Sequence, residues 1–316
     1  MGSQMVCNAL RKVRGSYKAL KIKKGQEVPE ISFKETSSIH YCARTFTLKK
    51  ETLSLFSINK RIKCSFRIGP HQEKYLNQGK IKEGELIRRG KEWFFNLVIE
   101  LPEVPLKKEG TILGVDLGEN NSAVTSNGTI YGGGKLKAER DRFLNRRKKL
   151  QSNGSKASKR CLKKTSGKER RRVKETNHCI SKALVEEALL KEAKIIALED
   201  LKNIRKRIKG NKRMRTRLHR WPWRQLQCFI EYKAQNQGIE VVYVEPQYSS
   251  LTCSRCKKLG IRQKHLFKCL SCGSYQHSDR NAAINHCKLA ESVVSARAPV
   301  NVPMVAATAL ATSSFL

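Results

Sequence analysis

Two apolar runs, each closed by a single acid, constrain the fold of this chain more than any other feature. The run TILGV precedes Asp116, and the run KIIAL precedes Glu199. Apolar runs of this length are typical of strands that are buried on both faces. Between them, residues 180–188 place apolar side chains at helical spacing. A strand, a helix and a second strand in this order predict an α/β fold with a partly parallel sheet.

A third acid, Asp279, opens a short segment, residues 279–285, whose composition favours a helix. We expect its first turn to pack against the edge where both strands end, so that three carboxylates face one point. Hard cations such as Mg2+ prefer oxygen ligands, and two of them about 3.5 to 4 Å apart activate water and stabilise a leaving oxygen. The pattern therefore predicts a two-magnesium hydrolytic site formed by Asp116, Glu199 and Asp279.

Each acid also has a purely structural interpretation. Asp116 can cap a turn, Asp279 can be a helix N-cap, and Glu199 competes with its neighbour Asp200. Their joint placement at element ends favours the functional interpretation. The histidines do not follow the spacing of a metal-binding motif; they lie at positions 178, 219, 265, 277 and 286.

Four cysteines between the second and third acids follow the pattern C-x2-C-x12-C-x2-C: Cys253, Cys256, Cys269 and Cys272. This spacing is typical of a zinc ribbon. Four thiolates fill the tetrahedral shell of zinc, so the sequence predicts one structural Zn2+ with no open position for catalysis. The other seven cysteines show no pairing pattern, and no secretory signal precedes them. We therefore expect free thiols in a reducing cytoplasm.

The charge of the chain indicates its partner. A formal net charge of +38 on 316 residues implies a polyanion, and nucleic acid is the obvious one. The basic runs fall at residues 146–149, 163–164, 170–172, 205–207 and 212–215. Solvated helix faces usually carry mixed signs, whereas these runs are nearly one-signed, which favours contacts with phosphate backbones. No apolar run reaches the length of a membrane span.

The first 110 residues have a different pattern. Alternating polar and apolar residues predict antiparallel strands at 38–44, 61–66 and 92–99. The last of these places Trp93, Phe95, Leu97 and Ile99 on one face, which we interpret as part of a sheet core rather than a base-stacking surface. Residues 8–20 predict a short basic helix, and residues 102–110 predict a linker.

With these motifs in place, the chain resembles the TnpB (OrfB) proteins of insertion sequences, which are relatives of the type V CRISPR effectors. The resemblance spans residues 9–298. Its ordered motifs are GVDLG at 114–118, TNHCIS at 176–181, ALEDL at 197–201, IEYKA at 230–234, YSS at 248–250 and DRNAA at 279–283. The resemblance implies an RNase H-like, RuvC-type nuclease that uses a transposon-end RNA to cut double-stranded DNA beside a short adjacent motif. It makes the three acids Mg2+ ligands and the four cysteines zinc ligands.

The resemblance also predicts the domain organisation. We expect a β-rich, nucleic-acid-binding module with a reduced recognition lobe, the first part of a RuvC-like domain, an inserted zinc ribbon, the last part of the RuvC-like domain, and a tail. Their bounds are 1–110, 111–250, 251–275, 276–295 and 296–316. Family members usually carry a long helical recognition lobe near the start, and that lobe is almost absent from this sequence. Such helices help to hold the guide and the target, so intact acids alone do not guarantee cleavage.

The sequence therefore predicts a transposon-encoded, Mg2+-dependent endodeoxyribonuclease with guide RNA and double-stranded DNA as partners, in a prokaryotic cytoplasm and associated with the nucleoid. A catalytically weak or inactive RNA-guided DNA-binding protein, or a truncated remnant, is the alternative that the reduced lobe favours. A third interpretation is a transposase that joins strands itself, although no motif indicates machinery for recognising and joining DNA ends.

Overall fold

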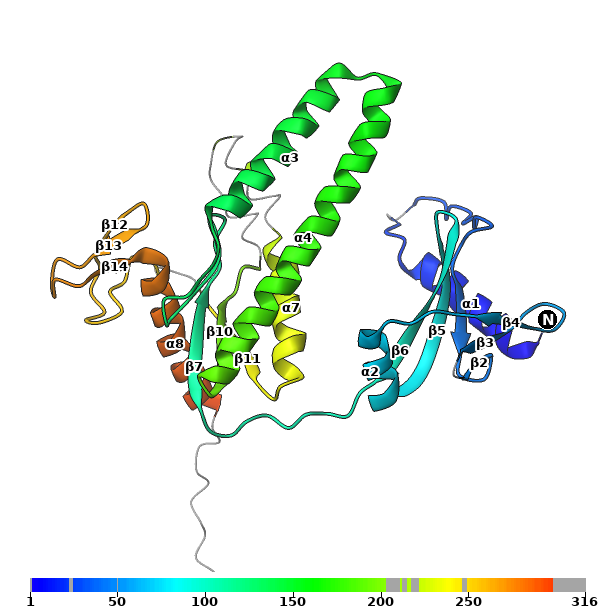
Figure 1. The fold of residues 1–316 in the computed structure, drawn as a ribbon, viewed down its shortest axis with the longest axis horizontal. Coiled ribbons are helices and arrows are strands. Elements are labelled where there is room, and N and C mark those ends of the chain that lie inside the picture. Colours follow the sequence, from blue (N-terminus) through cyan, green and yellow to red (C-terminus); the bar gives the residue numbers. More distant parts are fainter. Residues whose placement is uncertain are drawn as a thin grey trace, which may run out of the picture. The chain divides into compact units, whose positions relative to one another are not determined.

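The computed structural model describes residues 2–22, 25–49, 51–202, 211, 215–216, 222–245 and 249–297. The chain forms two compact units, Met1–Glu103 and Val104–Leu316 (Figure 1). The described residues include no helix that is both long enough and apolar enough to cross a membrane. The basic runs at 205–207 and 212–214, Tyr248 of the YSS motif and the tail from 298 onward lie outside the described residues.

The N-terminal unit is built mainly from antiparallel strands. Its elements are α1 (Ser3–Lys18), β1 (Ile39–Cys42), β2 (Phe46–Lys49), β3 (Thr52–Phe56), β4 (Arg61–Ser65), α2 (Pro70–Gln78), β5 (Lys80–Arg89) and β6 (Glu92–Glu100). Two three-stranded sheets form, in the orders β1-β5-β6 and β2-β3-β4, and every pairing is antiparallel. The antiparallel strands predicted at 38–44, 61–66 and 92–99 are confirmed. The predicted basic helix is also present, although it begins and ends earlier than expected.

The core of this unit forms around one aromatic ring. Tyr41 and Phe46 contact Phe95 edge-on, with ring centroids 5.8 and 5.1 Å apart. The ring lies over Gly84 on the paired strand, where an added Cβ would come within 2.3 Å of Phe95. The predicted core face of β6 is wrong at one position, because Trp93 is 54% exposed. Trp93 lies beside the β5–β6 turn, where the Arg88 guanidinium covers its ring instead of core residues.

The C-terminal unit contains a mixed five-stranded sheet. Its elements are β7 (Thr111–Asp116), β8 (Asn121–Thr125), β9 (Ile130–Gly132), α3 (Gly134–Asn153), α4 (Lys156–Leu190), β10 (Ala193–Glu199), α7 (Trp223–Gln235), β11 (Glu240–Val244), β12 (Ile261–Gln263), β13 (Leu266–Lys268), β14 (Tyr275–His277) and α8 (Ser278–Arg297). The strand order is β11-β10-β7-β8-β9, in which β10 is parallel to both neighbours and β7, β8 and β9 are antiparallel. The predicted strand, helix and parallel strand are therefore confirmed.

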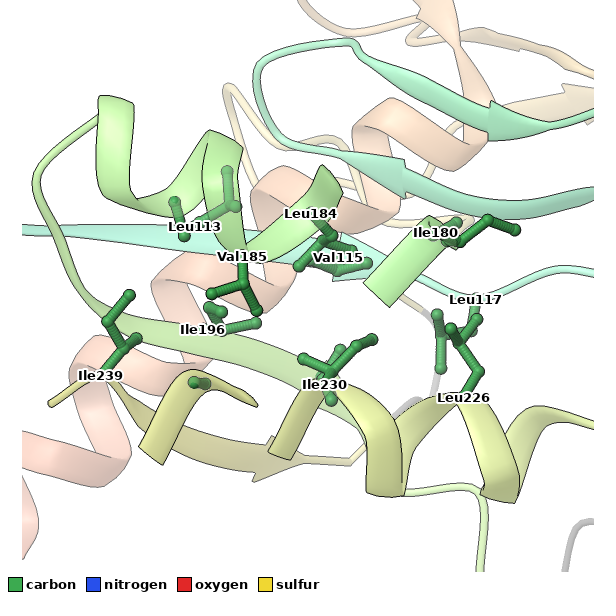
Figure 2. Packing of buried hydrophobic residues seen from close by; sticks show 14 of the residues in the cluster. Leu113, Val115, Leu117, Ile180, Leu184, Val185, Ile196, Leu226, Ile230 and Ile239 are labelled. Atoms are coloured by element: carbon green, nitrogen blue, oxygen red, sulfur yellow. The ribbon is translucent and has the colours of Figure 1, made fainter. Parts of the chain in front are cut away.

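Helices cover both faces of this sheet. Successive side chains of a strand point to opposite faces, so Ile196 and Leu198 of β10 pack toward α4 and α7, and Ile195 and Ala197 pack toward α8. Figure 2 shows the larger of these two clusters, where apolar side chains of α4 and α7 meet those of β7 and β10. This double burial explains why both strands are apolar almost throughout.

The last helix is longer than the sequence suggested. We expected a short helix over residues 279–285, whereas α8 continues to Arg297. Its second half packs Ala290, Val293 and Val294 onto the sheet, and this burial stabilises turns that the local sequence alone does not specify. Gly114 of β7 allows the close approach, because an added Cβ would lie 1.9 Å from the Ala283 carbonyl oxygen. The helix therefore lies directly on the strand that ends in Asp116.

Candidate metal centres

The sheet brings the first two acids together. Asp116 ends β7 and Glu199 ends β10, and these strands are parallel neighbours with Val115 opposite Leu198. Their carboxylates therefore lie at the same edge, with oxygen atoms within 4.8 Å of one another. Asp200, the alternative to Glu199, instead accepts a hydrogen bond from the Lys202 amide at 2.8 Å.

Burial makes both carboxylates unusually basic. It raises the pKa of Asp116 well above its ordinary value, and the charges of Glu199 and Asp279 raise that pKa further, against an opposing effect of the Arg262 guanidinium. Burial also raises the pKa of Glu199 to about 7, although Glu199 Oε1 accepts a hydrogen bond from the Leu117 amide at 3.2 Å. Two crowded carboxylates of this kind have a strong affinity for a proton or a metal cation.

The third acid lies nearby with both of its oxygens engaged. Asp279 lies in the first turn of α8, and its position inside the helix rules out the N-cap interpretation. Its Oδ2 accepts from Asn121 Nδ2 at 3.1 Å, and its Oδ1 accepts from Arg262 Nη2 at 3.2 Å and from Ser278 Oγ at 3.1 Å. Asp279 acts electrostatically on the other two acids, but it does not belong to the group of ligand atoms that Asp116 and Glu199 form.

A histidine joins the first two acids instead. His286 of α8 is fully buried, and one of its ring nitrogens lies within 4.8 Å of the carboxylate oxygens of Asp116 and Glu199. Burial lowers the pKa of His286 to about 4, so the ring is neutral at physiological pH. Sequence reasoning missed this residue because it considered only spacing among histidines. The available signal was the seven-residue step from Asp279, which places both side chains on one helix face.

Four thiols converge in a second cluster. The sulfurs of Cys253, Cys256, Cys269 and Cys272 all lie within 4.8 Å of one another. Two tight turns present them: the Lys257 amide donates to the Cys253 carbonyl at 3.0 Å, and the Gly273 amide donates to the Cys269 carbonyl at 3.1 Å. Lys257 has φ 65° and Gly273 has φ 72°, so a lysine occupies a backbone region that favours glycine.

This thiol cluster suits a soft cation. Amide hydrogen bonds, the largest from Cys272, lower the pKa of Cys269 to about 6, which favours its thiolate. In Cys272 a hydrogen bond from the Ser274 backbone is outweighed by burial and the neighbouring thiols, which raise the pKa of that thiol to about 11. All eleven cysteines of the chain are free thiols. The cluster can therefore hold a zinc ion with four sulfur ligands.

The cysteine cluster is tied to the acid cluster. Asn281 of α8 accepts from the Ser254 amide at 2.9 Å and donates to the Thr252 carbonyl at 2.7 Å. Arg262, which pairs with Asp279, lies on β12 of the small sheet that follows the first two cysteines. The fold of the segment that carries the four cysteines therefore sets the position of the Arg262 guanidinium at the acid cluster. The sequence did not indicate this connection.

The basic runs that the structure describes lie on a long helical hairpin. Helices α3 and α4 are joined through Gly154 and held side by side by ion pairs, Arg147 to Glu169 at 3.1 Å and Arg172 to Glu139 at 3.0 Å. Other cations on these helices are exposed: Arg146, Lys148, Lys149, Lys163, Lys164, Arg170, Arg171 and Lys174. Their one-signed exposure suits contacts with phosphates.

Two family models match the chain. That of OrfB_IS605, described as a probable transposase, matches residues 96–205, and that of the Cas12f1-like TNB domain matches residues 223–286. The chain is 34% identical over 260 residues to the TnpB-like protein MJ0751 of Methanocaldococcus jannaschii, which covers 76% of this chain and 91% of that protein. It is also 37% identical over 113 residues to the CRISPR-associated endodeoxyribonuclease Cas12f1 of Sulfoacidibacillus thermotolerans, covering 35% of this chain and 25% of that protein.

The fold is similar to a solved structure, the Cas12f1-sgRNA-target DNA complex. The TM-score is 0.55 with 19% sequence identity, and the match covers 79% of this chain and 59% of that one. The chain thus spans nearly the whole of its TnpB-like relative, but 25% of the Cas12f1 endodeoxyribonuclease and 59% of the Cas12f1 chain in the solved complex.

Proposed function

The chain belongs to the family of TnpB-like proteins, and on that premise we propose that it is a transposon-encoded, RNA-guided endonuclease that hydrolyses phosphodiester bonds in DNA. The observation that carries this proposal is the pair of neighbouring carboxylates, half-buried Asp116 and buried Glu199, at the ends of two parallel strands. Crowded acids of raised pKa are costly to a fold and are typical of catalytic metal sites.

We assign the five-stranded sheet to an RNase H-like domain of the RuvC type. Three antiparallel strands followed by two parallel strands, in the order β9-β8-β7-β10-β11, support this assignment. In the proposed organisation, residues 111–250 and 276–295 form the nuclease, residues 251–275 form a zinc ribbon, residues 1–110 form a nucleic-acid-binding module, and residues 296–316 form a tail. The proposed substrate places the protein in the cytoplasm, at the nucleoid.

The acid cluster fits the Mg2+ ions that this chemistry uses. Asp116, Glu199 and Asp279 would hold them, since hard cations take carboxylate oxygens. Bound Mg2+ supplies activation of a water nucleophile and stabilisation of the leaving oxygen. The Leu117 amide fixes Glu199, and Asn121 and Arg262 fix Asp279, so these two carboxylates are oriented before substrate arrives. The apolar core beneath the strand ends keeps water from the buried side of the site.

The cysteine cluster fits a structural role. Four thiolates complete the tetrahedral shell of Zn2+ and leave no position for a reacting group. The bound ion would fix the segment that carries Arg262, and through it the orientation of Asp279.

Guide RNA and double-stranded DNA are the proposed partners. The solved Cas12f1 structure of similar fold is a complex with a guide RNA and target DNA, and the net charge of +38 suits two polyanions. The exposed cations of α3 and α4 would contact the phosphate backbones. In the N-terminal unit, Arg88 and Arg89 lie over the exposed rings of Trp93 and Phe94, at 5.7 and 5.3 Å from the ring centroids. Such pairs are suited to stacking on unpaired bases.

One observation favours a second candidate function. Asp279 is already paired with the Arg262 guanidinium at 3.2 Å, and a fixed cation at that carboxylate competes with Mg2+. This arrangement is consistent with a guided DNA-binding protein that cleaves weakly or not at all. Replacing Arg262 by glutamine separates the two candidates: a binder restrained in this way gains Mg2+-dependent cleavage, whereas a nuclease that uses Arg262 to orient Asp279 loses it.

The main test is cleavage of a plasmid carrying a guide-matched target by protein co-expressed with its transposon-end RNA, in Mg2+ and in EDTA. We expect guide-dependent and Mg2+-dependent cutting that Glu199→Gln abolishes while RNA and DNA binding persist. Asp200→Asn is the matched control, because Asp200 is adjacent in sequence but lies outside the group of ligand atoms that Asp116, Glu199 and His286 form. Equal loss of cutting in both variants, or cutting retained in Glu199→Gln, would refute the assignment.

A further inference from the structure

His286 occupies a position at the acid cluster that has no structural explanation. It lies two helical turns after Asp279 on α8, on the same face, and the absence of a side chain at Gly114 lets that face approach β7 closely. The ring is fully buried at the end of the strand that carries Asp116. A buried polar ring is costly unless both nitrogens find partners.

One nitrogen of His286 has a partner that fixes the tautomer. Nδ1 lies 3.1 Å from the carbonyl oxygen of Val115. A carbonyl oxygen only accepts, so Nδ1 carries the hydrogen and Nε2 presents its lone pair. A backbone carbonyl that holds one nitrogen of an imidazole in this way is the usual outer-shell contact of a metal-binding histidine.

The other nitrogen has no partner. Nε2 is buried and makes no hydrogen bond within the described part of the chain. Two carboxylates lie close to the ring, because one ring nitrogen of His286 and one oxygen each of Asp116 and Glu199 lie within 4.8 Å of one another. Three lone-pair donors that converge in this way need a proton or a cation between them. A proton on one carboxyl group joins only one pair of these atoms, whereas a divalent cation engages all three. An ordered water can satisfy the nitrogen, but it leaves two crowded carboxylates uncompensated.

We propose that Nε2 of His286 is a nitrogen ligand of the divalent cation held by Asp116 and Glu199. This inference rests on the metal centre of the proposed function and changes its character from an all-oxygen site to a mixed nitrogen and oxygen site. Imidazole favours first-row transition ions over Mg2+. The cation bound between these three side chains is therefore a first-row transition ion such as Mn2+ rather than strictly Mg2+.

A second histidine group serves as an internal comparison. His265, His277 and Asp279 also place ligand atoms within 4.8 Å of one another, and the two rings stack with centroids 5.5 Å apart. His265 is exposed, however, and Asp279 in this group is engaged by Arg262. We do not assign a cation to this group, and its histidines provide matched control variants.

The test uses Mn2+ as the probe, bound to the full-length, tag-free chain and observed by electron spin resonance. Pulsed measurements detect coupling between the manganese electron spin and a coordinated imidazole nitrogen. We expect this coupling in the parent protein, its replacement by 15N coupling when histidine is isotopically labelled, and its loss in His286→Asn. Asparagine retains a donor for the Val115 carbonyl but has no atom at the Nε2 position. His277→Asn and His265→Asn should retain the coupling.

Affinity provides a second readout. His286→Asn should weaken Mn2+ binding about 10-fold or more and weaken Mg2+ binding less, because Mg2+ depends on the oxygen ligands. His286→Leu, which has a side chain of comparable size and no nitrogen, should give the same result and guards against a folding defect of the first variant. Zinc content and circular dichroism check that each variant is folded.

The outcomes separate the inference from the proposed function. Binding of Mn2+ that requires Asp116 but shows no nitrogen coupling, or coupling that persists in His286→Asn, overturns the role of His286 and leaves the metal centre standing. If Asp116→Asn leaves Mn2+ binding unchanged, or if the parent protein binds no Mn2+, both the role of His286 and the metal centre of the proposed function are overturned. Coupling that disappears in His277→Asn instead assigns the ion to the other histidine group and also overturns the inference.

Discussion

Replacing Gly114 by alanine is expected to destabilise the packing of α8 on β7 and to weaken the acid cluster with it. The added Cβ would lie 1.9 Å from the Ala283 carbonyl oxygen, 2.8 Å from Cys287 Sγ and 2.9 Å from the Ala283 carbonyl carbon. Ordinary contacts are about 3.5 Å or longer, so the helix must retreat by roughly 1.5 Å. Two of these atoms are backbone and cannot rotate away.

The magnitude follows from overpacking. Inserting a methyl group into a packed interior typically costs about 1 to 3 kcal/mol, and the rigid backbone contact places this variant near the upper end. The same retreat withdraws His286 and Asp279 from Asp116, since both lie on α8. We therefore expect Mn2+ affinity to fall together with stability.

Hydrogen exchange of the β7 and β10 amides measures the loss of stability within this unit. An Mn2+ titration measures the change in metal affinity at the acid cluster. Gly167→Ala is the matched control, because Gly167 lies inside α4 and its added Cβ would meet only the end of the Arg171 side chain at 3.6 Å. The free energy of unfolding of that variant should rise by about 0.5 to 1 kcal/mol, because alanine has a higher helix propensity than glycine. A Gly114→Ala protein with parental exchange rates and parental affinity would refute the close-approach argument.

Three further results are expected. Because the folded pKa of Glu199, about 7, lies above its ordinary value of 4.5, the folded state keeps a proton that the unfolded state has released between those values. The contribution of this group to stability is then full below pH 4.5 and lost as the pH rises through 7, so urea unfolding in Mg2+-free buffer should show a decline that Glu199→Gln flattens and added Mg2+ opposes. Cys256→Ser should reduce zinc in the purified protein from about one atom per chain to near zero by elemental analysis, because one of four sulfur ligands is lost; unchanged zinc would contradict the ribbon. Leu198→Ala should cost about 2 to 5 kcal/mol in chemical denaturation because the side chain is fully buried, whereas Leu190→Ala, at a position 83% exposed, should stay within about 0.5 kcal/mol of the parent protein.

Much of the fold could be predicted because its signals are local. The apolar runs before Asp116 and Glu199 formed the parallel pair β7 and β10, and the segment with helical spacing between them formed α4. In the N-terminal unit, alternation of polar and apolar residues located the antiparallel strands. Each of these patterns reports which side chains a strand or helix must bury, and burial is a property of the segment itself.

The predictions were less accurate where an element depends on what packs against it. Helix α8 extends to Arg297 because its second half covers the sheet, and Trp93 is exposed because the hairpin end that carries it lies beyond the apolar cluster. Neither outcome can be read from the residues concerned, since the covering groups lie elsewhere in the chain.

The sequence by itself determined which acids end which elements and that four cysteines share one short segment, because spacing along the chain fixes both. The tertiary structure alone decided which side chains meet. Nδ1 of His286 forms a hydrogen bond with the carbonyl of Val115, 171 residues earlier in the chain. Asp279 accepts hydrogen bonds from Asn121, 158 residues earlier, and from Arg262 of the small sheet beside the cysteines. Side-chain directions at such a site depend on how a helix lies on a sheet to within an ångström, and that is set by the packed core and by the missing side chain of Gly114.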